Sequence, residues 1–144
     1  MSEDSLPAPL QEDLANLREA IVEFHDQTIR EDGGLPGLRD ENLLELCVAR
    51  PWMSAYGEDV YTTPYQKAAA IAEAIVCHHA FNDGNHRAAL GAAYILLDQY
   101  DLQLVTPKDE TLDAIRRLES RGMSTDQFGS WLERNCVLRL QPPL

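Results

Sequence analysis

The run from Ala88 to Leu97 limits the fold more than any other part of the chain. It reads AALGAAYILL and contains no charged side chain. A helix formed by this run has no polar face, so other elements must cover it on every side. We therefore expect this helix to lie at the centre of the domain.

Helices that can cover it are predicted from apolar residues that recur at steps of three and four. They span residues 11–29, 41–49, 64–79, 109–120 and 125–136. Residues 50–61 have no such period and are predicted to form an ordered loop or small hairpin, and residues 102–105 a short extended piece. The sequence thus predicts an all-α fold with one domain over 11–140, a flexible leader over 1–10 and a tail over 141–144.

Three residues mark the ends of these helices. Asp40 stands at the N-cap position of the helix over 41–49, and Pro51 stops that helix. Thr63 is expected to cap the next helix, whose first turn contains a proline.

Charge and hydropathy exclude several functions. The net charge of −12 argues against general nucleic-acid binding, because phosphate backbones need a basic surface. No apolar run is long enough to cross a membrane, and the acidic start lacks the basic-then-apolar order of a signal peptide. We expect a cytoplasmic protein that binds neither nucleic acid nor a membrane.

The cysteines Cys47, Cys77 and Cys136 are widely separated and odd in number. A disulfide framework is therefore not expected. Free cysteine is among the most buried residue types, so we expect all three side chains to face the core.

The segment between the helix over 64–79 and the apolar helix holds the residues best suited to chemistry. It reads His-Ala-Phe-Asn-Asp-Gly-Asn-His-Arg over residues 79–87. The first N–H groups of the second helix have no partner within that helix, so they attract anions such as phosphate. Gly84 lets the backbone turn sharply, and the Arg87 guanidinium could bind a phosphate.

The other side chains of this segment suit complementary roles. His79 could act as a general base because its imidazole titrates near neutral pH. Asp83 beside an anion site predicts Mg²⁺ as the bridge between the carboxylate and the phosphates. Phe81 is expected to anchor the loop in the core, and Asn85 to bond either the loop backbone or a phosphate.

The segment resembles the signature of the Fic/Doc family, His-x-Phe-x-(Asp/Glu)-(Gly/Ala)-Asn-x-Arg. The positions that match are His79, Phe81, Asp83, Gly84, Asn85 and Arg87. The segment Gly-Gly-Leu-Pro-Gly-Leu at 33–38, and the helices predicted before and after the motif, resemble the Doc toxin branch. The resemblance implies a compact helical bundle with the active loop at the N-terminus of the central helix, and an ATP-using transferase that modifies a protein hydroxyl.

Two positions bear on which group is transferred. Members that transfer AMP continue the motif as Gly-Asn-Gly-Arg-x-x-Arg, whereas this chain has His86 at the second glycine and Leu90 at the second arginine. Doc-like members share these departures, usually with lysine in place of His86, and resemble protein kinases that present the γ-phosphate of ATP. The resemblance then implies His79 as base, Asp83 as magnesium ligand, and residues 84–87 as the phosphate cradle. Kinase activity is favoured, and AMP transfer stays open as the alternative.

Partners are also implied by the resemblance. Doc-like toxins are usually neutralised by a separate antitoxin, and we find no convincing copy of the inhibitory (Ser/Thr)-x-x-x-Glu-(Gly/Asn) helix of other Fic proteins. The implied substrate is a component of translation such as an elongation factor. We expect a target peptide to dock on the irregular segment that contains Arg50, Trp52 and Tyr56; the alternative is that this segment is a buried structural loop.

Two other functions are considered beside that of a transferase. One is a metal site built from Glu73, Cys77, His78, His79 and His86, but adjacent histidines on a helix point about 100° apart and seldom share a metal. The other is a catalytically silent interaction module of the same fold, for which the changes at His86 and Leu90 leave room. His25, beside the apolar stripe of the first helix, is expected to be structural.

Overall fold

The computed structural model describes residues 8–139 of the 144-residue chain. Six α-helices make up most of these residues, and the strands are short, so the predicted all-α fold is confirmed. The elements are α1 (Ala8–Asp32), α2 (Glu41–Ala49), η1 (Arg50–Trp52), β1 (Ser54–Ala55), β2 (Glu58–Asp59), α3 (Pro64–His78), α4 (Asn85–Asp98), β3 (Leu102–Leu104), α5 (Lys108–Glu119), α6 (Thr125–Arg134) and β4 (Cys136–Leu138). The predicted tail and the first seven residues of the predicted leader lie outside the described residues.

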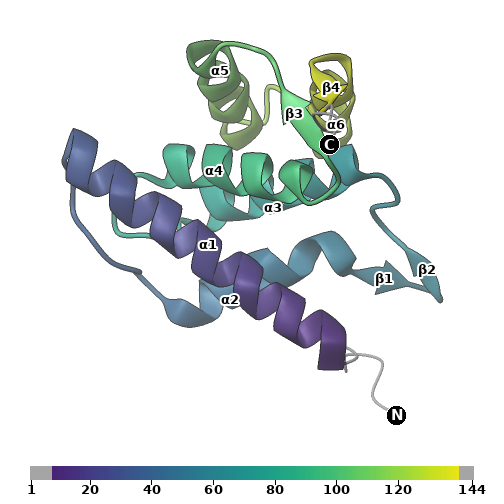
Figure 1. The fold of residues 1–144 in the computed structure, drawn as a ribbon, viewed down its shortest axis with the longest axis horizontal. Helices are drawn as coiled ribbons and strands as arrows, with labels where there is room; N and C mark the ends of the chain where they lie inside the picture. The colour runs from purple at the N-terminus through teal and green to yellow at the C-terminus, as the bar shows by residue number, and fades with distance from the viewer. Residues whose placement is uncertain (1–7, 140–144) are drawn as a thin grey trace, which may run out of the picture.

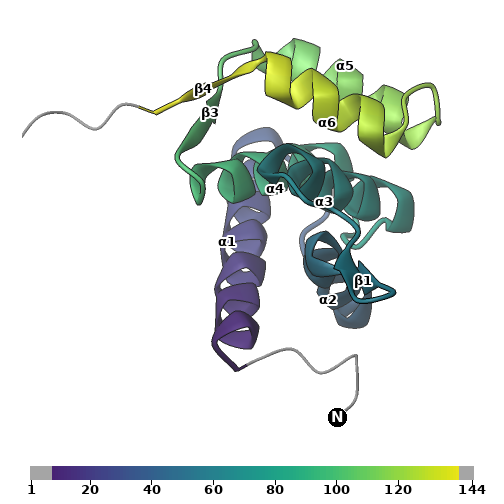
Figure 2. The ribbon, with the colours of Figure 1, turned by 90° about the vertical axis from the view of Figure 1, so that its right-hand side faces the viewer.

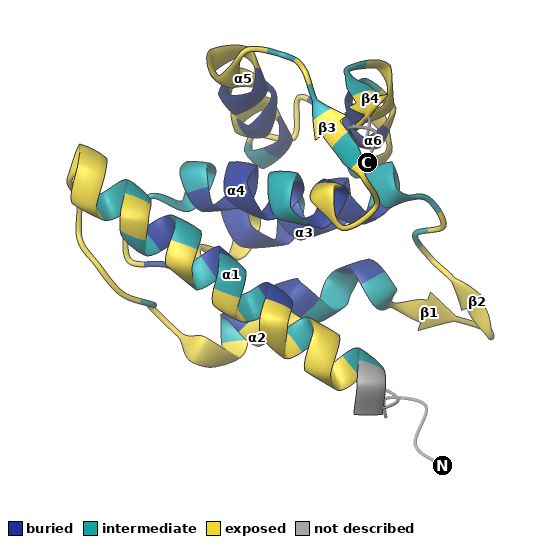
Figure 3. Ribbon diagram, viewed as in Figure 1, coloured by how far each residue is buried: buried dark blue, intermediate teal, exposed yellow. Residues whose placement is uncertain are grey.

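Helices α3 and α4 form the middle layer of the molecule (Figure 1). Helices α1 and α2 lie on one side of this layer, and α5 and α6 lie on the other (Figure 2). Because α4 contacts α1, α3, α5 and β3, the prediction of a covered central helix is confirmed. Most of its residues are buried, as Figure 3 shows.

Small residues on α4 allow α1 to pack closely against it. A Cβ atom added at Gly91 would lie 2.2 Å from Cδ1 of Phe24, so the α1–α4 contact requires glycine at this position. The main cluster of buried side chains extends from α1 through α3 and α4 to α5 and α6. This core fixes the two helix ends that border the candidate site.

The first helix begins earlier than predicted. Helix α1 starts at Ala8 rather than at Gln11, so the last three residues of the expected leader are helical. Pro9 is compatible with this start because the first turn of a helix needs no backbone N–H from it. None of the helices within residues 8–139 is both long enough and apolar enough to cross a membrane.

The predicted caps of α2 and α3 are confirmed. Asp40 accepts a hydrogen bond from the backbone N–H of Asn42 at 2.9 Å. Thr63 caps α3 in a reciprocal pair with Gln66, which bonds back to the N-cap backbone. These caps fix the N-terminal end of α3, and its C-terminal end leads into the segment 79–87.

Two strand pairs lie outside the helical layers. β1 and β2 form the small hairpin that was one of the two predictions for residues 50–61. β3 pairs antiparallel with β4, with Gln103 opposite Val137. The predicted helix over 125–136 therefore ends two residues early, at Arg134, because Cys136 joins a strand whose partner is distant in the sequence.

The cysteine prediction is confirmed for Cys47, holds in part for Cys136, which packs half-buried against the core, and is wrong for Cys77. Cys47 is fully buried in the core, but Cys77 is exposed and Cys136 is half-buried. Cys77 is the last residue but one of α3, and Cys136 lies on an edge strand. Burial raises the pKa of Cys47 and of Cys136 to about 11.

Candidate active site

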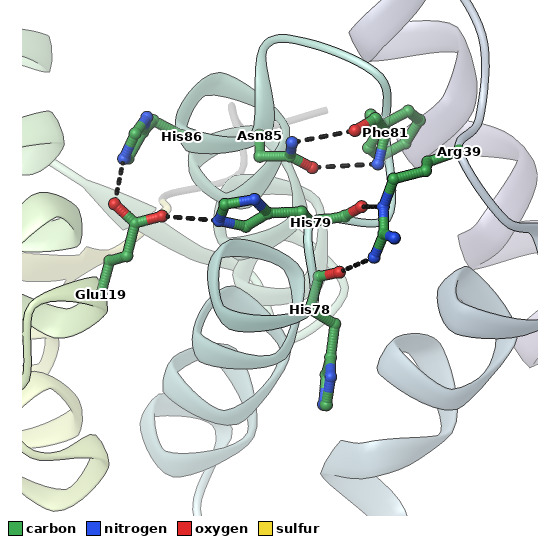
Figure 4. A network of polar contacts seen from close by, with 7 residues as sticks. All are labelled: Arg39, His78, His79, Phe81, Asn85, His86 and Glu119. Atoms are coloured by element: carbon green, nitrogen blue, oxygen red, sulfur yellow. Dashed lines mark hydrogen bonds and ion pairs between the residues drawn. The ribbon is translucent and has the colours of Figure 1, made fainter.

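The C-terminal end of α3 sets the position of His79. Its backbone is left-handed, with φ 52° and ψ 61°, and its N–H still donates to the Ile75 carbonyl. Arg39 donates to the carbonyl of His79 from Nε at 2.7 Å and to that of His78 from Nη2 at 2.6 Å (Figure 4). The guanidinium of Arg39 thus satisfies two carbonyls at the helix end and holds His79 in a conformation that is uncommon for residues other than glycine.

A short backbone pairing fixes the loop that follows. Leu38 and Phe81 form an isolated antiparallel bridge, and the Arg39 N–H donates to the Ala80 carbonyl at 2.9 Å. The Phe81 ring is buried, with 1% of its surface exposed. The structure therefore places Phe81 at the base of the loop, the position expected of an anchor.

Asn85 uses its side-chain amide on the loop backbone. Its Oδ1 accepts from the Phe81 N–H, and its Nδ2 donates to the Phe81 carbonyl, both at 3.0 Å (Figure 4). Of the two roles expected for Asn85, the structure shows the contact to the loop. Its backbone N–H lies in the first turn of α4, where it can still face an anion.

A buried histidine of α1 supports the loop from below. His25 is completely buried, and its Nε2 lies 2.7 Å from the Asp83 carbonyl oxygen, so Nε2 carries a proton and donates it. Its ring stacks on Phe81 at a centroid separation of 3.9 Å. Its Nδ1 has no hydrogen-bond partner among the described residues. The structural role expected for His25 thus consists in holding the loop.

The Asp83 carboxylate is held in place by two backbone amides. Oδ1 accepts from the Gly84 N–H at 2.9 Å, and Oδ2 accepts from the Leu35 N–H at 3.2 Å. Oδ2 would lie 2.9 Å from a Cβ added at Gly34, whose φ is +119°. The Gly-Gly segment therefore brings the backbone close to a carboxylate that stays exposed.

The N-terminus of α4 is open. Gly84 is its N-cap, with φ 72°, and no side chain caps the helix. The first intrahelical bond runs from the Ala88 N–H to the Gly84 carbonyl, so the amides of residues 85–87 have no intrahelical acceptor. These amides and the positive end of the helix dipole can bind an anion.

Two further positions affect phosphate binding. Arg87 forms an ion pair with Asp32, the last residue of α1, and both side chains are partly exposed. Leu90 is buried, with 1% of its surface exposed, and belongs to the core. The position where AMP-transferring members carry a second arginine is thus a packing position in this chain.

Glu119, the last residue of α5, joins the two histidines of the motif. One carboxylate oxygen lies 3.0 Å from Nε2 of His79, and the other lies 2.9 Å from Nε2 of His86 (Figure 4). Burial acts to raise the pKa of Glu119, but the hydrogen bonds from His86 and His79 outweigh it, so the pKa lies below its ordinary value. Sequence reasoning missed Glu119 and Arg39 because both are distant in sequence from the residues that they contact.

A separate cavity of about 510 Å³ opens beside the last turn of α3. Glu73, Cys77 and His78 line it, whereas His79 and His86 face Glu119. The residues of the metal site considered from the sequence therefore lie in two separate places. Among the residues that the structure describes, no three His, Cys, Asp or Glu side chains are grouped so that they could hold a metal ion.

The three predicted docking residues have different surroundings. Arg50 lines the same cavity and pairs with Glu73 at 2.5 Å, and Trp52 packs partly buried against the core. Tyr56 is fully exposed at the tip of the β1–β2 hairpin, with φ 54°. The structure does not bring these three side chains together on one surface, and Tyr56 is the one presented to solvent.

The comparisons with known proteins agree with this geometry. A model of the Fic/DOC family matches residues 14–97, which is more than half of the chain. A protein named Toxin Doc from Mycolicibacterium smegmatis is 34% identical over 102 residues, which cover 69% of this chain and 78% of that protein. A protein named Protein kinase doc from Escherichia phage P1 is 31% identical over 86 residues, which cover 60% of this chain and 68% of that protein. The chain belongs to the Fic/DOC family, on its Doc branch.

Proposed function

We propose that this chain is a toxin-like protein kinase that transfers the γ-phosphate of ATP to a hydroxyl group of a target protein. The observation that carries the proposal is the uncapped N-terminus of α4, which directly follows the loop that starts at His79. A phosphate site beside a general base is the arrangement that phosphoryl transfer to a hydroxyl needs. The name of the phage P1 relative, Protein kinase doc, supports the same reaction.

Each residue of the loop has a different role in this reaction. His79 removes the proton of the acceptor hydroxyl. The amides of residues 85–87 bind phosphate oxygens, and Arg87 can exchange Asp32 for a phosphate because that ion pair is partly exposed. Asn85, Phe81 and His25 act on the loop itself and keep its backbone in place.

The residues present also fit Mg²⁺. Asp83 offers an exposed carboxylate whose orientation two backbone amides already fix. Magnesium is commonly held by one or two protein carboxylates together with substrate phosphates. When bound, it would neutralise charge on the transferring phosphate. Asp83 is the residue that would hold it.

The surroundings of Leu90 favour kinase activity over AMP transfer. A leucine in the core cannot bind the phosphate tail that a second arginine would hold, and His86 adds a ring where AMP-transferring members have glycine. Loss of one charge-assisted contact, worth about 1.5–3 kcal/mol, is enough to change which nucleotide pose prevails.

A labelling experiment tests this proposal. Purified protein, Mg²⁺ and a bacterial lysate are incubated with ATP labelled at either the γ- or the α-phosphate. The wild-type chain is expected to transfer label from the γ-position alone, and His79→Ala is expected to transfer none. Transfer from the α-position would establish AMP transfer instead, and absence of both would favour the silent interaction module.

The partners belong to the same proposal. We place the protein in the cytoplasm, with a translation component such as an elongation factor as its substrate and a separate antitoxin as its inhibitor. The name Toxin Doc of the mycobacterial relative supports the antitoxin. Purification of the tagged chain from its native host should recover a small second protein in stoichiometric amount; recovery of the chain alone would count against inhibition by a separate protein.

A further inference from the structure

We propose that Glu119 is a positioning residue for the general base, and the proposal rests on the kinase function above. Glu119 lies outside the motif, on a different helix, and its two carboxylate oxygens contact Nε2 of His79 and Nε2 of His86. Figure 4 shows the carboxylate between the two rings.

The end of α5 holds Glu119 at this place. The preceding residue, Leu118, is 2% exposed and packs in the core, so the backbone beside Glu119 cannot shift freely. Helix α5 then ends in a tight turn, with Arg121 in a left-handed conformation and the Gly122 N–H bonded to the Arg117 carbonyl. The Glu119 side chain is about one-third exposed, which is less than that of His79.

The contact fixes where the proton of His79 resides. An ionised carboxylate accepts hydrogen bonds and cannot donate one, so the ring nitrogen that faces it must carry a hydrogen. His79 in its neutral form therefore carries its proton on Nε2, and its lone pair is on Nδ1. Within residues 8–139, Nδ1 of His79 has no hydrogen-bond partner, so it is free to accept a proton.

The reaction then proceeds with Nδ1 as the base. The proton of the acceptor hydroxyl moves to Nδ1, while the hydroxyl oxygen forms a bond to the γ-phosphorus. The bond from that phosphorus to the β–γ bridging oxygen breaks, and ADP leaves with the electron pair. His79 becomes a cation, and the negative charge of Glu119 stabilises it in the same way that the carboxylate of a catalytic triad stabilises its histidine.

The contact with His86 has a separate consequence for nucleotide binding. His86 lies in the first turn of α4, where the phosphates are proposed to bind, and Glu119 places a negative charge beside it. Phosphate and carboxylate compete for this ring. Removal of the charge should therefore lower KM for ATP, because binding improves, and also lower kcat, because proton transfer is impaired. This combined fall of kcat and KM separates positioning from a purely structural role.

The test compares Glu119→Gln with the wild-type chain. Glutamine has the same shape but can donate a hydrogen bond, so it permits the tautomer with the proton on Nδ1. We expect kcat to fall by about tenfold or more, a part of the 10²–10⁴ that a general base contributes, and KM for ATP to fall. Glu119→Asp should recover part of kcat. Glu110→Gln, a change of equal charge at an exposed position on α5, should leave both constants unchanged.

A measurement without substrate distinguishes failure of this inference from failure of the kinase proposal. Nitrogen chemical shifts of the neutral His79 ring, recorded by NMR, report its tautomer directly. We expect the Nε2-protonated form in the wild-type chain and a mixture in Glu119→Ala. The inference is overturned by the same tautomer distribution in both proteins, or by an unchanged or raised kcat in Glu119→Gln. A raised kcat would mean that Glu119 inhibits the enzyme.

Discussion

At the scale of single residues, the site depends on side chains that the motif does not contain. Arg39, His25 and Glu119 come from three different segments, and each contacts either the motif backbone or a motif side chain. The motif therefore supplies the reacting groups, while its geometry is set by residues distant in the sequence. This division allows the contribution of geometry to be measured separately from that of chemistry.

Arg39 offers such a measurement. Arg39→Ala removes both hydrogen bonds at the end of α3, so the left-handed conformation of His79 loses its support. We expect the free energy of unfolding to fall by about 1 kcal/mol and phosphate transfer to fall by a larger factor. Urea unfolding and the γ-label assay measure the two effects.

Arg30→Ala is the matched control for this variant, since Arg30 is an exposed arginine in the last turn of α1. Lysine at position 39 should restore little, because an ammonium group cannot reproduce the planar fork of a guanidinium. If the Arg39→Ala and Arg30→Ala variants transferred phosphate equally well, the proposed role of Arg39 would be wrong.

The three thiols are predicted to differ in reactivity. Burial raises the pKa of Cys47 to about 11, and that of Cys136 to about 11, so little thiolate is present on either at pH about 8.5. Burial also raises the pKa of Cys77, but its side chain is exposed. Iodoacetamide should therefore modify Cys77 first in the folded protein, and all three only in urea, as measured by peptide mass spectrometry. Native modification of Cys47 at the rate of Cys77 would contradict this order.

At the scale of elements, the contact between α1 and α4 requires glycine at position 91. In Gly91→Ala the new Cβ would lie 2.2 Å from Cδ1 of Phe24 and 2.7 Å from its Cγ, so the ring and α1 must shift. We expect this substitution to lower the free energy of unfolding by about 1–3 kcal/mol. Thermal or urea unfolding measures the change.

Gly129→Ala in α6 is a matched control for that substitution. Its new Cβ would lie 3.5 Å from the nearest atoms, which is ordinary contact, and alanine favours the helix by about 1 kcal/mol. This variant should therefore be at least as stable as the wild-type chain. Equal stability of the Gly91→Ala variant and the wild-type chain would show that α1 does not press against α4 as described.

The β1–β2 hairpin is tied to α3 by a buried lysine. The Lys67 ammonium donates to the Tyr61 carbonyl at 2.5 Å and lies 3.4 Å from the Pro51 carbonyl, so it links both ends of the hairpin segment. Lys67→Met should loosen the hairpin and speed exchange of the Val60 amide by about tenfold, measured by hydrogen exchange. Lys108→Met, at an exposed lysine, is the control and should leave this exchange unchanged. An unchanged exchange rate in Lys67→Met would show that Lys67 does not hold the hairpin in place.

At the scale of the whole molecule, the sequence predicts the helices but not the contacts between distant segments. The apolar run over 88–97 and the caps at Asp40 and Thr63 depend on local periodicity and local hydrogen bonds, so their positions could be predicted. The pairing of β3 with β4 depends on a partner more than thirty residues away, and local patterns do not report it. For the same reason a local pattern overestimated the burial of Cys77 and Cys136.

The candidate site shows the same limit. The motif indicated His79 and Asp83 because their residue types and spacing suit a phosphate site. Glu119 lies 40 residues after His79, and the packing of α5 on α3 and α4 brings it to the two histidines. The residue type of Asn85 suited either a contact with the loop backbone or a contact with a phosphate. The structure shows the contact with the backbone of Phe81, which the sequence could not decide.

The mass that a purified target protein gains from this chain tests the central claim most directly. After incubation with the wild-type chain, ATP and Mg²⁺, the target should gain the mass of one phosphate group on a serine, threonine or tyrosine. Incubation with the His79→Ala variant should leave its mass unchanged. A gain equal to one AMP group would contradict the account, because it would mean that a buried Leu90 and a histidine at position 86 do not prevent the nucleotide from presenting its α-phosphate.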